Sequence, residues 1–163
     1  MVRIFIDKLG SGHEDLFIKI DNSPTYIKTV DSYYLLDFLE ITDDYLQQNN
    51  IQNEEVLSYA TKQLIHYWNS RIGMTDNIKT IFLPFDFQDE SIGGLMVTLT
   101  SLGIRTKIVY SELIRGYEVN KTVFDQIISE RKIEFKNLEN VEWLISYQQF
   151  YDGLKWSLNE LNK

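Results

Sequence analysis

The chain has 163 residues, a formal net charge of −8 and no cysteine. A chain of this length is expected to form one domain over residues 1–163, with a core that needs no disulfide or metal ion to hold it together. The absence of cysteine excludes thiolate nucleophiles and sulfur-ligated zinc, and the negative charge disfavours nucleic acid as a partner because its phosphates would be repelled.

No segment of the sequence predicts targeting to a membrane or insertion into one. The N-terminal run MVRIFIDKLG has neither the apolar h-region nor the small-residue cleavage site of a signal peptide. No apolar run approaches the roughly 18 residues that a transmembrane helix needs. We therefore expect a cytoplasmic protein with no membrane partner.

Alternation of apolar and polar residues predicts two strands near the N-terminus, at residues 2–7 and 15–21. A period of two is typical of strands with one buried face, and the turn-rich residues between the two runs predict a hairpin. The following segment predicts a short strand at 26–30 and then a helix from 32 to 40 or beyond.

The clearest predicted helix covers residues 54–72. Its apolar residues recur at helical spacing and form one core-facing stripe: Leu57, Ala60, Leu64, Trp68 and Ile72. Asn53 is the expected N-cap, and the two glutamates that follow it suit the positive end of the helix dipole.

Three further strands are predicted in the middle of the chain, at residues 79–87, 92–101 and 104–111. Pro84 inside the first of them indicates an edge strand, a bulge or a strand end. Gly93-Gly94 predicts a bulge or a close approach of two backbones.

Leu102-Gly103 is expected to form a hairpin turn between the second and third of these strands, and residues 116–119 could extend the third. Residues 122–129 have the spacing of a short helix, and residues 141–145 are predicted to form a final strand.

The second clear helix is predicted at residues 147–161, where Ser146 and Gln149 match the capping box of a helix start. The predicted strands and helices do not alternate strictly. The sequence therefore predicts a single α+β domain, a mostly antiparallel sheet packed by two main helices at about 54–72 and 147–161.

The negative charge is concentrated in one segment. Seven acids and no lysine or arginine lie between Thr29 and Thr61, so this segment carries −7 and the rest of the chain −1. Such a segment would steer a basic partner towards it. The alternative is a solvated acidic face that only keeps the protein soluble.

Residues suited to catalysis are few. The histidines are His13, in a glycine-rich loop, and His66, off the apolar stripe of the 54–72 helix, and no nucleophile-elbow motif accompanies either. Asp86, Asp89 and Glu90 lack the alternation and central glycine of a calcium loop. We therefore expect no enzyme activity, no metal site and no cofactor.

The central run TIFLPFDFQDE, residues 80–90, combines buried-type aromatics with acids. We expect its phenylalanines to anchor a strand end in the core and its acids to project from the following turn. This run and Gly93-Gly94 resemble a pattern in small bacterial cytoplasmic proteins that act as immunity partners of polymorphic or contact-dependent toxins. The resemblance covers about a dozen residues and implies a non-catalytic protein that neutralises a toxin domain.

The leading hypothesis is therefore a protein-binding module with an acidic face for a basic toxin domain. Its expected partner-binding residues are the acids Asp37, Glu40, Asp43, Asp44, Asp86, Asp89 and Glu90, with Tyr45 and Trp156 as aromatic anchors. Two alternatives stay open: a small enzyme or ligand-binding protein with a site around His13, Asp86 and Glu90, or a homo-oligomer built by exposed aromatic residues.

Overall fold

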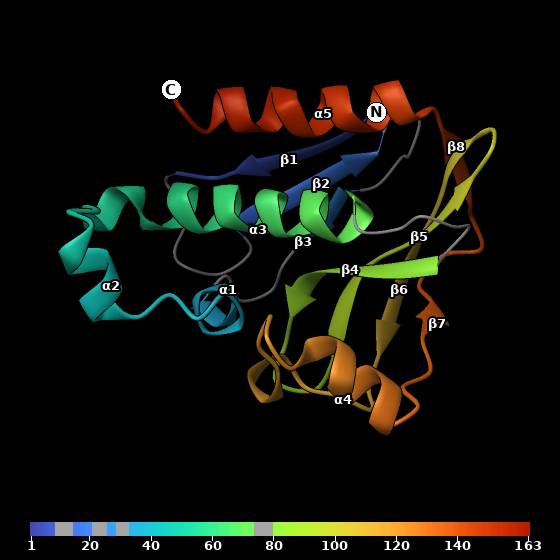
Figure 1. Cartoon of the computed structure of the whole chain (residues 1–163), viewed down its shortest axis with the longest axis horizontal. Helices are drawn as coiled ribbons and strands as arrows, with labels where there is room; N and C mark the ends of the chain where they lie inside the picture. Colours follow the sequence, from blue (N-terminus) through green and yellow to red (C-terminus); the bar gives the residue numbers. More distant parts are fainter. Residues whose placement is uncertain (9–14, 21–25, 29–32, 74–79) are drawn as a thin grey trace.

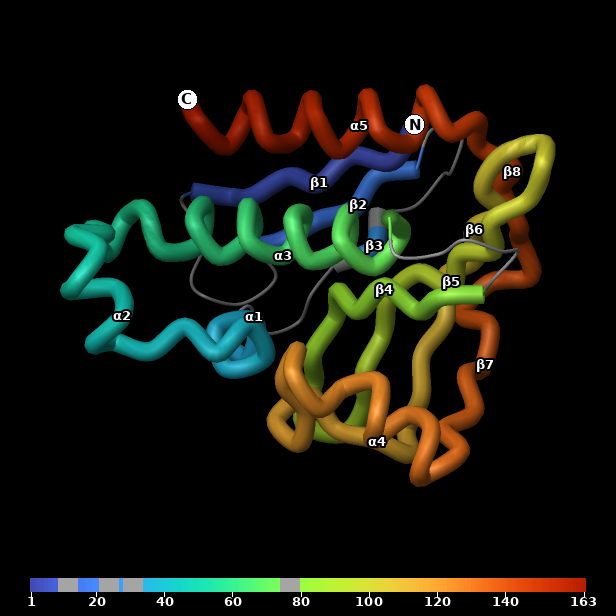
Figure 2. Tube along the Cα trace, viewed as in Figure 1, coloured from blue at the N-terminus to red at the C-terminus, as the bar shows by residue number. Residues whose placement is uncertain are grey.

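The computed structural model describes residues 1–8, 15–20, 26–28, 33–73 and 80–163. These residues form a single α+β domain with two antiparallel sheets, which confirms the predicted fold class (Figure 1). The predicted single sheet is thus two sheets. Figure 2 shows helices α1 (Tyr33–Phe38) and α2 (Asp43–Gln48) at one end of the molecule and strand β8 (Trp143–Ile145) at the other.

The first sheet has the order β1-β2-β3 and consists of β1 (Val2–Ile6), β2 (Leu16–Ile20) and β3 (Tyr26–Lys28). The predicted N-terminal strands and their antiparallel pairing are confirmed, with Ile4 opposite Ile18. Both of these isoleucines are buried, because a period of two places every second side chain on the core face. The predicted loop between these strands lies mostly outside the described residues.

The segment after β3 contains two short helices, α1 (Tyr33–Phe38) and α2 (Asp43–Gln48). Glu40 separates them because its φ of 57° is left-handed and cannot continue a helix. Thr42 then starts α2 by accepting a hydrogen bond from the Tyr45 amide on its side-chain oxygen. The helix predicted from residue 32 is confirmed, but it ends before Glu40, and α2 is a separate element.

The long predicted helix is confirmed as a one-turn 3₁₀ segment, η1 (Asn53–Glu55), followed by α3 (Val56–Gly73). Its N-cap is Gln52 and not Asn53. Helix α3 contacts both α5 (Tyr147–Glu160) and β4. Ser58 on α3 donates a hydrogen bond to the carbonyl of Leu161, just past α5.

The second sheet is built around the strand β6. Its strands are β4 (Thr80–Phe87), β5 (Ile92–Thr100), β6 (Gly103–Ser111), β7 (Lys136–Asn137) and β8 (Trp143–Ile145). They run in the order β4-β5-β6, and β7 and β8 pair with different parts of the free side of β6.

The structure confirms the predictions for Pro84 and for Gly93-Gly94. Strand β4 is an edge strand, and its pairing with β5 shifts between Pro84 and Asp86. A Cβ on Gly94 would lie 2.2 Å from the Leu83 carbonyl oxygen, so only glycine allows this approach. The outer side of β4 is covered by α3, because the Trp68 indole N–H donates to the Pro84 carbonyl at 3.0 Å.

Two predictions in the middle of the chain are wrong. The β5–β6 turn consists of Ser101 and Leu102, and Gly103 already pairs with Thr100 at a φ of 138° that suits glycine. Residues 116–118 form a 3₁₀ segment, η2 (Gly116–Glu118), and do not extend β6. The Gly116 amide bonds to the Gln88 carbonyl, so η2 folds against the β4–β5 turn.

The remaining elements are close to those predicted: α4 (Phe124–Glu130), β8 and α5. The core is one continuous cluster that joins both sheets, and the phenylalanines of the 80–90 run are buried in it, as predicted. None of the helices in the described ranges combines the length and apolar character needed to cross a bilayer.

Candidate functional site

Six carboxylates that are close together in the sequence are all exposed. They lie on or beside α1, α2 and η1: Asp37, Glu40, Asp43, Asp44, Glu54 and Glu55. None of them forms an ion pair within the described part of the chain. We call these six residues the acidic surface.

Five acids elsewhere in the molecule form ion pairs with nearby cations. Their ion pairs are Asp125–Arg71 at 2.7 Å, Glu118–Arg131 at 3.2 Å, Glu112–Lys136 at 2.6 Å, Glu142–Lys107 at 3.4 Å and Glu160–Lys163 at 2.5 Å. Among the described residues, the six acids of the acidic surface have no such pair, although Glu54 and Glu55 line a second pocket together with three lysines, Lys8, Lys62 and Lys163.

Local structure explains why these carboxylates point to solvent. Helices α1 and α2 are short, and their buried residues Leu35, Phe38 and Leu46 occupy one side of each helix. Asp37 and Asp44 lie two positions from Leu35 and Leu46, respectively, and so point away from them. Glu40 is held in place by the Thr122 hydroxyl, which donates to its carboxylate at 2.5 Å.

Tyr45, an anchor predicted from the sequence, lies on α2 among these acids. Its hydroxyl is 2.7 Å from the hydroxyl of Tyr59 on α3, and its side chain is 40% exposed. The hydrogen bond from Tyr45, with a smaller contribution from burial, raises the pKa of Tyr59 to about 12. The pair therefore fixes the ring of Tyr45 at the surface while leaving part of it open.

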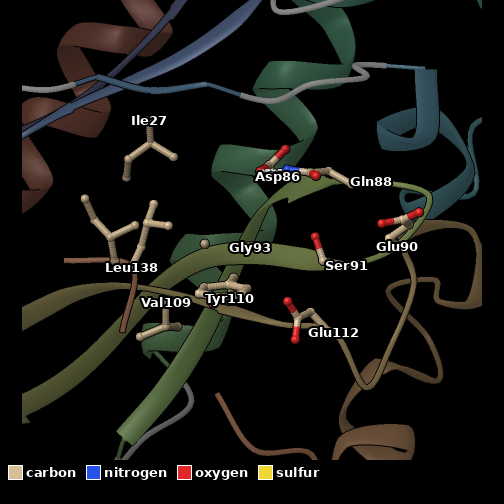
Figure 3. Close-up of a pocket in the computed structure, with 12 residues that line it drawn as sticks. Ile27, Asp86, Gln88, Glu90, Ser91, Gly93, Val109, Tyr110, Glu112 and Leu138 are labelled. Atoms are coloured by element: carbon tan, nitrogen blue, oxygen red, sulfur yellow. Dashed lines mark hydrogen bonds between the residues drawn. The ribbon is translucent and has the colours of Figure 1, made fainter. Parts of the chain in front are cut away.

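The three predicted acids of the β4–β5 region separate into two groups. Asp89 accepts a hydrogen bond from the hydroxyl of Tyr34, which places this turn beside α1. The Tyr34 ring also lies 6.3 Å from the ring of Tyr117 on η2. Asp86 and Glu90 instead line a pocket (Figure 3). The turn therefore joins the acidic surface to that pocket.

The pocket has a volume of about 370 Å³ and lies between β3 and the β5–β6 hairpin. Figure 3 shows apolar side chains at one end and carboxylates at the other. Its lining consists of Ile27, Asp86, Gln88, Glu90, Ser91, Gly93, Gly94, Ile108, Val109, Tyr110, Glu112 and Leu138. Among the described residues that form this lining there is no lysine or arginine, although Lys136 lies at the rim and pairs with Glu112.

Two of the pocket's carboxylates accept hydrogen bonds from neighbouring side chains. The Gln88 side-chain amide donates to Asp86, and Lys136 donates to Glu112 at 2.6 Å. The Lys136 ammonium also lies 5.7 Å from the centre of the Tyr110 ring, which shows that the rim of this pocket already attracts a cation.

Trp156, the second predicted anchor, is not brought together with the acidic surface. It lies on α5 where that helix packs along β1, with its ring 5.2 Å from Phe5 and 5.6 Å from the Arg3 guanidinium carbon. The side chain is half-buried. This arrangement gives Trp156 a packing role between α5 and β1.

The alternative site around His13, Asp86 and Glu90 is only partly described. His13 lies outside the described residues, whereas Asp86 and Glu90 do line one pocket. His66 is exposed on α3. Within the ranges that the structure describes, no group of three histidine, aspartate or glutamate side chains is arranged to hold a metal ion.

Sequence reasoning missed Glu112, Tyr34 and Tyr117. Glu112 could have been found from the register of the β5–β6 hairpin. Ile92 pairs with Ser111, and the residues just beyond this pair, Ser91 and Glu112, both line the pocket. No local pattern marks the two tyrosines, which meet only when α1 and η2 pack together.

Comparisons with protein-family models, curated proteins and solved structures found no match for this chain.

Proposed function

We propose that this protein is a non-catalytic, cytoplasmic protein-binding module of the immunity type, which neutralises a basic toxin domain through the acidic surface. One observation carries the proposal: six exposed carboxylates lie close together in sequence and lack ion pairs in the described part of the chain, and the sequence between Thr29 and Thr61 has no lysine or arginine. The Tyr45 ring among them supplies an aromatic contact of the kind that often dominates binding.

Electrostatic reasoning supports a basic partner over a merely soluble surface. Solubility alone does not require a surface with one sign of charge, because a surface with acids and bases interspersed is also soluble. A face of one sign instead raises the association rate of an oppositely charged partner, and the effect weakens as salt is added. A toxin that acts on nucleic acid needs a basic cleft, and an acidic surface would occlude it.

The test reverses two charges on α2. The partner to use is the toxin domain encoded beside this protein's gene, and binding would be measured by titration calorimetry at about 50 and 300 mM salt. We expect Asp43→Lys with Asp44→Lys to weaken binding by at least about tenfold at low salt, which corresponds to about 1.4 kcal/mol. We also expect it to reduce the salt dependence of the affinity, because fewer charges are then screened.

A matched control keeps the same change in net charge. Glu130→Lys with Glu134→Lys alters two exposed acids in and just beyond α4, away from the acidic surface. This control should bind nearly as well as the unaltered protein. If both double variants bind alike, or if no toxin domain is encoded beside the gene, the proposal is wrong.

A further inference from the structure

The pocket beside the β4–β5 turn is continuous with the acidic surface. Asp89 in this turn bonds to Tyr34 of α1, and its neighbour Glu90 lines the pocket. A partner that covers α1 and this turn would therefore also cover the pocket mouth. Such a partner could place one side chain into the cavity without any change in the backbone around it.

The shape of the pocket suits a long side chain with a polar head. Ile27, Val109 and Leu138 lie at its apolar end, and the carboxylates of Glu90 and Glu112 lie towards the turn (Figure 3). A side chain with an apolar stem and a charged head would match both ends at once.

The glycines of β5 keep this cavity open. A Cβ on Gly93 would come within 3.2 Å of the Asp86 Cβ and 3.5 Å of one of its carboxylate oxygens. A larger residue at position 93 would therefore crowd the Asp86 carboxylate. With glycine in place, the peptide faces of β5 form a flat wall next to the Tyr110 ring.

We infer that this pocket receives an arginine side chain of the basic partner. Charge complementarity favours a cation, because three carboxylates line the pocket and the Lys136 ammonium at its rim pairs with one of them, Glu112. Arginine fits better than lysine because its planar guanidinium pairs with carboxylates through two hydrogen bonds and stacks on aromatic rings and flat peptide groups. The identity of the partner rests on the proposed function, but the preference of the pocket can be tested alone.

The test uses the free protein and N-acetyl-arginine amide as the probe, followed by ¹⁵N–¹H NMR. We expect saturable shifts at the amides of Gly93 and Gly94. Glu90→Gln should weaken the probe about tenfold, because a charged hydrogen-bond acceptor becomes neutral. The matched control Asp152→Asn removes the same charge from the exposed side of α5, outside the pocket and the acidic surface, and should leave probe binding unchanged.

Three results would overturn the inference: no shift at the two glycines, equal weakening by both variants, or binding of N-acetyl-lysine amide as tight as that of the arginine probe. The first result would show that the probe does not bind in the pocket. The second would show that it responds only to the overall negative charge. The third would show that the pocket does not prefer arginine. Each result is independent of the toxin titration, so failure of the pocket and failure of the acidic surface can be told apart.

Discussion

Tyr67 shows how a single side chain of α3 is embedded in a charged cluster. Its hydroxyl accepts a hydrogen bond from Arg71 at 3.0 Å, and its ring packs edge-on against Phe38 at 5.4 Å. Arg71 in turn holds Asp125 of α4 with two hydrogen bonds of 2.7 Å. Burial is the main reason that the pKa of Tyr67 rises to about 12.

This raised pKa predicts a loss of stability at high pH. Between pH 10 and 12 the unfolded chain releases the Tyr67 proton while the folded protein keeps it, so the free energy of unfolding falls as pH rises. The loss is at most about 1.4 kcal/mol per unit of pKa difference. Urea unfolding of the unaltered protein and of Tyr67→Phe at pH 9, 10 and 11 would measure it.

The Tyr67→Phe variant should have the shallower pH dependence, because phenylalanine has no proton to release. Other tyrosines and the lysines titrate in both proteins and cancel in the comparison. Equal slopes for the two proteins would show that Tyr67 titrates normally.

At the scale of elements, α5 closes the outer edge of the first sheet. The Ile4 amide on β1 donates to the Ser157 hydroxyl at 2.8 Å, and the same hydroxyl donates to the Gly153 carbonyl at 2.9 Å. A Cβ on Gly153 would lie 2.1 Å from the Val2 carbonyl oxygen, so the helix and strand are in direct contact. An edge that could pair with another chain is thereby covered.

Removing the Ser157 hydroxyl should lower the stability of the protein. Ser157→Ala leaves the buried Ile4 amide without its acceptor, so we expect a loss of about 1–3 kcal/mol in the free energy of unfolding. Ser70→Ala is the control, since Ser70 also donates to a helix carbonyl but is exposed, and it should change stability by less than about 0.5 kcal/mol. Urea titrations would measure both, and equal effects would contradict a special role for Ser157.

Elements with a long periodic pattern could be predicted from the sequence, and short ones could not. The α3 stripe and the β1 alternation extend over enough residues for the hydrophobic period to be visible. Strand β7 has two residues, both exposed, so it exists only because β6 offers a partner edge. The boundary between α1 and α2 depends on the backbone angle of Glu40, which no pattern reveals.

An error of two residues in the predicted register of the β5–β6 hairpin hides part of the pocket. A turn at Leu102-Gly103 would pair Ile92 with Leu113, whereas the structure pairs Ile92 with Ser111. A shift of two residues keeps every side chain on its face of the sheet, so the core looks right either way. It nevertheless moves Glu112 away from Ser91, and the pocket rim cannot then be foreseen.

For the whole molecule, the shared core predicts cooperative unfolding. Trp68, Trp143 and Trp156 lie on α3, β8 and α5, so their fluorescence samples both sheets. Because one continuous core joins these elements, we expect urea midpoints from fluorescence and from far-ultraviolet circular dichroism to coincide. Separate midpoints would show that the two sheets unfold independently.

The candidate site is assembled from distant parts of the chain. The sequence shows the acidic segment between Thr29 and Thr61, but not that Asp89 lies beside it, since this contact joins α1 to a turn some 55 residues away. Likewise, nothing local indicates that Asp86 and Glu90 line a cavity while Asp89 leaves it. Packing of distant elements decides these placements.

The carboxylates of the acidic surface also link partner binding to the stability of the fold. A basic partner would bind the arrangement of these charges that α1, α2 and η1 create in the folded protein, so binding would stabilise the folded state by mass action. A partner present at 100 times its dissociation constant would add about 2.7 kcal/mol to the free energy of unfolding.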